Sequence, residues 1–192
     1  LFPYTTLFRS HMARDYALPG LAAMAQRDRA RVMFDFTADS DLSKPELYRQ
    51  LRDAAEALTA GERDGIANMA NVAALIGEFL PRLNWSGFYR MIEGELVLGP
   101  FAGRPACIRI PLGQGVCGTA AESGETQIVE DVHAFPGHIA CDAASRSELV
   151  VPIVREGAVI AVIDLDSPDR ARFDREDAKG VEALAALLSD RI

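Results

Sequence analysis

The sequence predicts an α+β fold: an antiparallel sheet with helices from both ends of the chain on one face and a loop-covered pocket on the other. Two helical segments precede Pro81, short β-prone runs separated by turn residues follow, and another helical segment closes the chain. Helices that bracket a meander of strands indicate this fold class. With 192 residues, 49% of them hydrophobic, the chain can bury one ordinary core, so we expect one folded domain.

Capping signals and apolar stripes predict the helices. Ser43 followed by Pro45 and Glu46 has the composition of an N-cap and first turn, and Asp174 can cap the closing helix. An apolar stripe predicts the second helix, which Pro81 ends, and a run of small residues indicates a short helix among the strands. The expected helices span residues 44–58, 63–80, 115–123 and 174–189.

The strands are predicted from short runs of β-prone residues bounded by turns such as Glu93-Gly94 and Glu156-Gly157. Residues 132–147, which include Pro136 and Gly137, are expected to form a long loop. The expected strands span residues 85–92, 95–99, 106–110, 127–130, 148–155 and 159–164.

The regular pattern begins only at Asp39, so we expect an N-terminal extension at residues 1–38 and one folded domain at residues 39–192. The segment Leu1–Ser10 resembles the translation of a sequencing adapter, and the alternative is a genuine, poorly structured extension. We exclude it from the fold argument.

Charge and hydropathy exclude several classes of partner. A net charge of −8 argues against nucleic acid and anionic membranes, since both attract basic surfaces. No apolar run approaches the roughly 18 residues that span a bilayer. The start of the chain lacks the order of a signal peptide, so we expect a cytoplasmic protein.

The three cysteines, Cys107, Cys117 and Cys141, all fall in one short stretch of the chain. Cysteines that served only as small hydrophobic residues would be scattered, so the cluster indicates a thiol site with redox, nucleophilic or metal-binding chemistry. Structural zinc is the weakest alternative, because His138 and Cys141 form only one close pair. An odd number of cysteines argues against a secreted disulfide scaffold.

Aromatic residues mark one face of the first expected strand. Alternation places Trp85, Gly87 and Tyr89 on the same face, and the glycine is expected to leave a gap for a flat or cationic ligand. The alternative is that both rings simply pack in the core, because aromatics are favoured on any half-buried sheet.

Acidic residues end the apolar run of residues 159–163. Asp164 and Asp166 are expected to leave the strand end on one face, roughly 7 Å apart. Two carboxyls in a poorly hydrated pocket resist ionising together, so one of them could remain a proton donor. The alternative is a solvated strand end before the turn at Ser167. Glu148 follows the cysteine region, either as a third acid of the same site or as an ordinary exposed glutamate.

Five segments together resemble the free methionine-(R)-sulfoxide reductases, enzymes built on a GAF domain. They are Trp85–Tyr89, Leu98–Phe101, Gly113–Gly118, the region around Cys141, and Val162–Ser167. The resemblance covers roughly residues 42–188. It implies reduction of free L-methionine-(R)-sulfoxide to L-methionine, with no metal or organic cofactor.

The resemblance also implies a role for each site residue. Cys141 would attack the sulfoxide sulfur and become a sulfenic acid, and Cys107 would resolve it as a disulfide, with Cys117 as the alternative resolving cysteine. Thioredoxin would recycle this disulfide. Trp85 would close over the substrate methyl group and Tyr89 would line the same pocket. The acids Glu148, Asp164 and Asp166 would hold the sulfoxide oxygen and the substrate amine. Because Asp164 and Asp166 share one strand face, we further expect Asp166 to donate the proton and Asp164 to stay charged.

Two alternatives from other classes stay open: a GAF sensory module that binds a small ligand, and a thiol redox switch. Only an enzyme would consume the free sulfoxide catalytically with a dithiol reductant. The oligomeric state is also open, with a homodimer among the alternatives.

Overall fold

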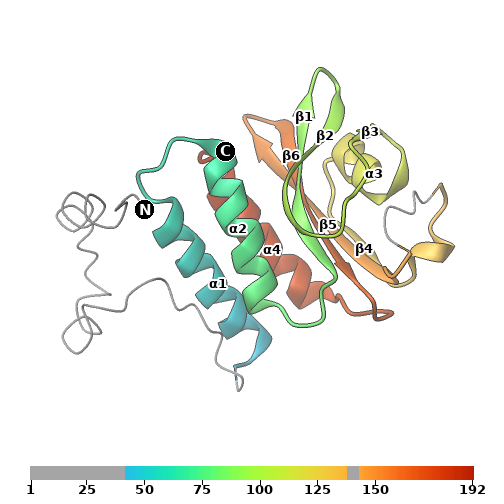
Figure 1. Ribbon diagram of the computed structural model, residues 1–192, viewed down its shortest axis with the longest axis horizontal. Coiled ribbons are helices and arrows are strands. Elements are labelled where there is room, and N and C mark those ends of the chain that lie inside the picture. The colour runs from blue at the N-terminus through green and yellow to red at the C-terminus, as the bar shows by residue number, and fades with distance from the viewer. Residues whose placement is uncertain (1–41, 138–142) are drawn as a thin grey trace, which may run out of the picture. The chain divides into compact units, whose positions relative to one another are not determined.

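The computed structural model describes residues 42–137 and 143–192. The expected extension at residues 1–38 lies outside this range. The predicted α+β class is confirmed: an antiparallel sheet of six strands, in the order β3-β2-β1-β6-β5-β4, has helices packed on both faces (Figure 1).

The strands are β1 (Trp85–Ile92), β2 (Glu95–Gly103), β3 (Arg109–Pro111), β4 (Gln127–Val129), β5 (Ser147–Arg155) and β6 (Ala158–Ser167). The helices are α1 (Lys44–Thr59), α2 (Gly65–Phe79), α3 (Gly115–Ser123), the 3-10 helix η1 (Val132–Ala134) and α4 (Arg175–Leu188).

Helices α2 and α4 cover one face of the sheet, α1 packs on these two helices, and the three together form the larger core. Leu51, Ile76 and Leu184, one from each helix, are fully buried in one cluster with Phe88 of β1 and Ile163 of β6. Burial of such apolar side chains supplies most of the favourable free energy of folding. This core therefore fixes the central strands β1 and β6 from behind.

Helix α3 packs against the opposite face and closes a smaller core. Val116 and Ala120 of α3 are buried in one cluster with Tyr89 of β1 and Val162 of β6. Because side chains alternate along a strand, Phe88 enters the larger core while Tyr89 enters the smaller one. The smaller core contains the candidate site.

Some boundaries differ from those expected. The second helix begins at Gly65 because the Asp64 side chain accepts hydrogen bonds from the backbone N–H groups of Ile66 and Ala67 and so caps it. Strand β2 continues to Gly103 because its last residues pair with β1, and part of the expected long loop forms η1.

Strand β6 corrects the expectation for the two aspartates. It was expected to end at residue 164, but it continues to Ser167 because residues 165–167 pair with residues 147–149 of β5. Asp164 and Asp166 therefore lie inside a paired strand and not at a solvated strand end.

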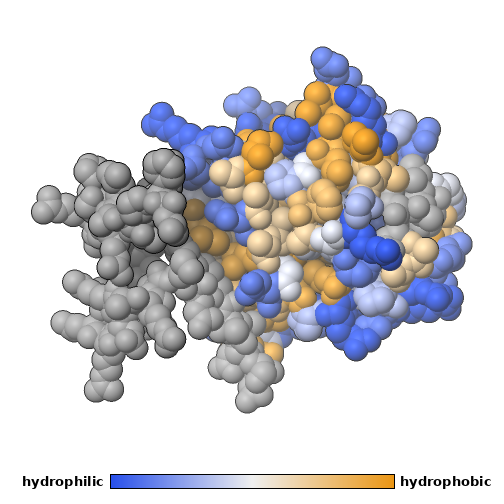
Figure 2. All heavy atoms as spheres, in the orientation of Figure 1, coloured by the Kyte–Doolittle hydropathy of each residue, from blue (hydrophilic) through white to orange (hydrophobic). Residues whose placement is uncertain are grey.

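The visible surface carries both hydrophilic and apolar side chains. Figure 2 shows hydrophilic residues around the rim of this face and apolar residues nearer its centre. Among the residues that the structure describes, no helix combines the length and the apolar composition needed to cross a membrane.

Candidate active site

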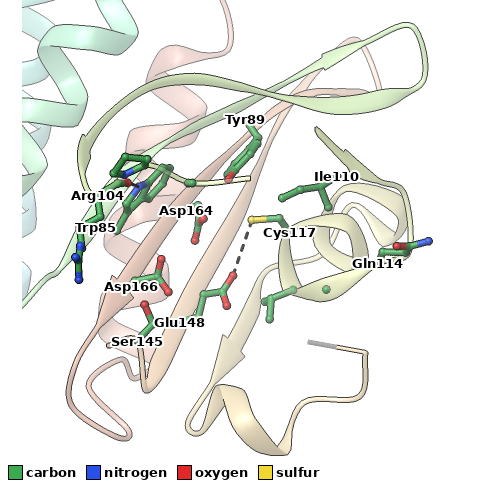
Figure 3. Close-up of a pocket in the computed structure, with 14 residues that line it drawn as sticks. Trp85, Tyr89, Arg104, Ile110, Gln114, Cys117, Ser145, Glu148, Asp164 and Asp166 are labelled. Atoms are coloured by element: carbon green, nitrogen blue, oxygen red, sulfur yellow. Dashed lines mark hydrogen bonds between the residues drawn. The ribbon is translucent and has the colours of Figure 1, made fainter. Parts of the chain in front are cut away.

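A cavity of about 40 Å³ lies between α3 and the face formed by β1, β5 and β6 (Figure 3). This volume has room for about three water molecules. It is lined by Trp85, Tyr89, Arg104, Pro105, Ala106, Ile110, Gln114, Gly115, Val116, Cys117, Ser145, Glu148, Asp164 and Asp166. Six of the predicted site residues therefore meet here, whereas Cys107 is not part of the wall and Cys141 lies outside the described residues.

The strand register explains why residues far apart in the sequence converge. Asp166 of β6 lies opposite Trp85 of β1 on one side and opposite Glu148 of β5 on the other. Residues opposite each other on adjacent strands share a face and lie about 5 Å apart. Asp164, two residues before Asp166, lies opposite Gly87 and therefore joins the same face.

The acids are buried. Glu148 and Asp164 are only 7% and 6% exposed, whereas Asp166 is half-buried. Burial raises the pKa of Glu148 well above its usual range, and the charges of Asp164 and Asp166 raise it further. Burial and the charge of Asp166 likewise raise the pKa of Asp164 well above its usual range. The pair thus favours the neutral, proton-bearing form, because water no longer solvates the carboxylate.

Cys117 projects from α3 toward these acids (Figure 3). Its Sγ lies 3.9 Å from Oε1 of Glu148, within reach of a weak S–H hydrogen bond. Burial raises the pKa of the Cys117 thiol well above its usual range, and the charges of Asp164 and Glu148 raise it further. A thiol in such an environment is a poor nucleophile.

The aromatic wall is built differently from the expectation. Trp85 stacks on Tyr89 and on Phe101, with ring centroids 5.9 and 5.3 Å apart. A Cβ at Gly87 would lie 2.7 Å from the Trp85 ring and 2.4 Å from Cβ of Phe101. The expected gap above Gly87 is therefore wrong: these two side chains fill it, and the glycine allows Trp85 to lie flat on the sheet.

The remaining predicted residues lie at the margin. Cys107 is partly buried and engaged in a disulfide bond, whereas Cys117 is a free thiol. His133 is exposed, contacts Asp131 through Nδ1 and does not line the cavity. His138 lies outside the described residues.

Two contributors to the cavity wall were missed in the sequence. The backbone oxygen of Arg104 accepts a hydrogen bond of 3.1 Å from Nε1 of Trp85 and so fixes the indole. Ser145 is buried, and its Oγ accepts a hydrogen bond of 3.0 Å from the Asn84 side chain. A backbone acceptor carries no sequence signal, and nothing in the sequence around Ser145 distinguishes it from other loop serines.

Comparison with known proteins identifies the family to which this chain belongs. The sequence model of the GAF domain family matches residues 67–192. The chain is 50% identical over 147 residues to the free methionine-R-sulfoxide reductase of Escherichia coli strain K12, covering 77% of this chain and 89% of that protein. It is 44% identical over 158 residues to the enzyme of the same name from Saccharomyces cerevisiae, covering 78% of this chain and 88% of that protein.

A solved structure agrees with both the fold and the family. The free methionine-R-sulfoxide reductase of Neisseria meningitidis, solved in complex with its substrate, superposes with a TM-score of 0.77 at 45% identity, covering 81% of this chain and 93% of that chain. The fold is thus that of a GAF domain. Within that class, the chain belongs to the free methionine-R-sulfoxide reductase family of oxidoreductases, which confirms the resemblance.

Proposed function

We propose that this protein reduces free L-methionine-(R)-sulfoxide to L-methionine. The observation that carries the proposal is the convergence of an aromatic wall and buried, protonatable acids in one cavity, together with a disulfide bond at Cys107, next to the cavity residue Ala106. A sulfoxide oxygen is a weak base, so its removal requires a positioned acid. The family relatives support the choice of substrate.

The substrate would use three parts of the cavity. The indole of Trp85 faces the partially positive sulfur and its methyl group. The first turn of α3, at Gly115 and Val116, offers backbone N–H groups that attract a carboxylate. Asp166, the least buried of the acids, is suited to remain charged and meet the substrate ammonium group.

The proton would come from the buried pair. Sequence alone gave the donor role to Asp166 and the charged role to Asp164, but burial favours a neutral Glu148–Asp164 pair. We assign Glu148 as the donor. Its carboxyl lies opposite Asp166 on the neighbouring strand, so it can reach a sulfoxide oxygen bound between them.

The thiol chemistry has two steps. The Cys141 thiolate attacks the sulfoxide sulfur and forms an S–S bond while a proton reaches the oxygen. The protonated oxygen then transfers to Sγ of Cys141 as the S–O and S–S bonds break, so methionine leaves and Cys141 becomes a sulfenic acid. The Cys107 thiol then attacks that sulfur, water leaves and a disulfide forms. Engagement of Cys107 in a disulfide and the buried, free state of Cys117 support Cys107 as the resolving residue.

Thioredoxin would then return both cysteines to thiols by disulfide exchange. Ile108, adjacent to Cys107, is 70% exposed and offers an apolar contact for such a protein.

Single-turnover methionine release tests the proposal. Cys141→Ser should release none, whereas Cys107→Ser should release one equivalent and then stop in the presence of thioredoxin. Cys117→Ser should cycle, since the buried thiol is not the resolving residue. Release of one equivalent by Cys141→Ser would refute the nucleophile, and failure of every form on the R sulfoxide would refute the function.

A further inference from the structure

The cavity also contains a set of atoms suited to a metal ion. Cys117, Glu148 and Asp164 each present one ligand atom, and these atoms all lie within 4.8 Å of one another. All three residues are buried, and Figure 3 shows their side chains converging from α3, β5 and β6. We propose that the substrate-free cavity binds one divalent ion of the zinc type and that the ion excludes the substrate.

The spacing suits a tetrahedral ion. Zinc binds thiolate sulfur at about 2.3 Å and carboxylate oxygen at about 2.1 Å, which separates the two ligand atoms by about 3.6 Å. Sγ of Cys117 and Oε1 of Glu148 are 3.9 Å apart. A shift of a few tenths of an ångström, within the range of a side-chain adjustment, would bring this pair to the separation that zinc requires.

A second, independent observation concerns Asp164. Its Oδ1 atom is buried and has no hydrogen-bond partner in the described part of the protein, although the residue is only 6% exposed. A buried oxygen without a partner costs free energy. A bound cation would satisfy this oxygen and offset the repulsion between the two carboxylates.

The ligand set selects the kind of metal. Magnesium and calcium prefer oxygen ligands, whereas zinc, cobalt and cadmium accept a thiolate together with carboxylates. Coordination would release the Cys117 proton to solvent. Three protein ligands leave one tetrahedral position free, and the cavity has room for a water molecule there.

The inhibitory effect rests on the proposed function, because the ion would occupy the acids that bind the sulfoxide. Metal binding itself does not depend on that function. The sequence did not indicate this site: its ligands come from three separate elements and do not form the close pairs of a structural zinc motif.

Cobalt absorption measures binding without any substrate. In the Cys107→Ser/Cys141→Ser form, Cys117 is the sole thiol, so one equivalent of Co²⁺ should produce a thiolate-to-cobalt charge-transfer band that Zn²⁺ abolishes. Adding Cys117→Ser should remove the band, and adding Asp164→Asn should weaken binding at least 10-fold. Asp53→Asn, on the exposed surface of α1, serves as the matched control and should change nothing.

Thermal unfolding without metal verifies that each variant folds. Absence of the band in the folded parent form, or its persistence after Cys117→Ser, would overturn the proposal. These results do not depend on turnover, so they separate the metal site from the proposed function.

Single-turnover kinetics test the inhibition. No dithiol is added, because it would itself bind the ion. Zn²⁺ should raise the sulfoxide concentration needed for half-maximal rate in the unaltered protein without changing the maximal rate. The same concentration of Mg²⁺ should have no effect. If Zn²⁺ inhibited Cys117→Ser as strongly as the unaltered protein, the ion would bind the other two cysteines, and the proposed site at Cys117, Glu148 and Asp164 would be refuted.

Discussion

Glu148 shows how burial sets the proton affinity of a single side chain. It lies on β5 opposite Asp166, under α3, and is 7% exposed. Burial raises the pKa of its carboxyl first, and the neighbouring aspartates add to the shift. The residue is therefore suited to carry a proton near neutral pH, which an exposed glutamate cannot do.

The first prediction concerns Glu148→Gln, which keeps the shape of the side chain and removes its acidic proton. We expect the single-turnover rate of methionine release to fall by about 10²–10⁴-fold, the usual contribution of a general acid. Glu125→Gln, on the exposed surface, is the matched control. A near-normal rate in Glu148→Gln would remove this residue as the donor.

The same burial predicts how stability depends on pH. The folded protein keeps Glu148 and Asp164 protonated at pH values where the unfolded chain, with pKa values of about 4, has released both protons. The free energy of unfolding contributed by this pair is thus present below pH 4 and is lost as pH rises toward the raised folded pKa values.

Glu148→Gln should therefore lose less stability than the unaltered protein between pH 5 and pH 8. Urea unfolding at several pH values gives the comparison, with Glu125→Gln as control. Parallel curves for the unaltered protein and Glu148→Gln would mean that the carboxyl ionises normally in the folded state.

At the scale of single residues, the sequence predicted which side chains share a face better than it predicted how deeply they are buried. Asp164 and Asp166 were predicted on one face because strand side chains alternate, and they do line one cavity. The burial of Glu148 could not be predicted, because it depends on α3, which covers β5 from a distant part of the chain. The orientation of Cys117 toward the acids depends on the same packing.

At the scale of elements, β1 brings the aromatic wall against the acids. Trp85 lies across Gly87 and stacks on Phe101 of β2, and its Nε1 donates to the backbone of Arg104. A side chain at Gly87 would collide with the Trp85 ring and with Cα and Cβ of Phe101. Strand alternation predicted that Trp85 and Tyr89 share a face, but only the pairing of β1 with β2 reveals what fills the space between them.

Gly87→Ala should displace Trp85. We expect a loss of about 1–3 kcal/mol in the free energy of unfolding, the usual cost of overpacking a core, together with weaker substrate binding. Gly77→Ala is the control: its Cβ would meet only Oγ of Ser86 at 3.7 Å, in ordinary contact, and alanine favours a helix. Chemical unfolding and KM measurements test both. Equal stability of the two variants would contradict the packing argument.

Helix boundaries were the most predictable elements, since their signals are local. Glu46 accepts hydrogen bonds from the backbone N–H and the hydroxyl of Ser43, as its spacing predicted. The ends of β2 and β6 were predicted too early. Each extends because a neighbouring strand supplies hydrogen-bond partners, which is a long-range effect that periodicity does not contain.

At the scale of the whole described domain, the sheet separates the larger hydrophobic core on one face from the candidate active site on the other. The larger core packs α2 and α4 against one face of the sheet and α1 against these two helices, while the smaller core beneath α3 holds the cavity. The fold class followed from pattern alone, but the cavity needed the register of three strands. This division also predicts which substrates the site accepts, because three acids line one small cavity.

A methionine sulfoxide within a peptide should be a poor substrate. Its nitrogen is a neutral amide, so it would leave the half-buried Asp166 without a cationic partner, and its flanking residues would collide with α3. We expect kcat/KM for N-acetyl-methionine-(R)-sulfoxide amide to be at least 10²-fold lower than for the free amino acid, since sites built to pair buried polar groups reject analogues that lack them.

Two singly blocked compounds show how much of this selectivity comes from the substrate ammonium group and how much from its carboxylate. The N-acetyl acid removes only the ammonium group and tests the carboxylates, whereas the amide with a free amine removes only the substrate carboxylate and tests the N-terminus of α3. The N-acetyl compound should lose more, because it leaves the half-buried carboxylate of Asp166 without its partner, while the N–H groups at the helix N-terminus can bind water instead. Equal kcat/KM values for the free and doubly blocked sulfoxides would show that the cavity does not recognise the free amino acid.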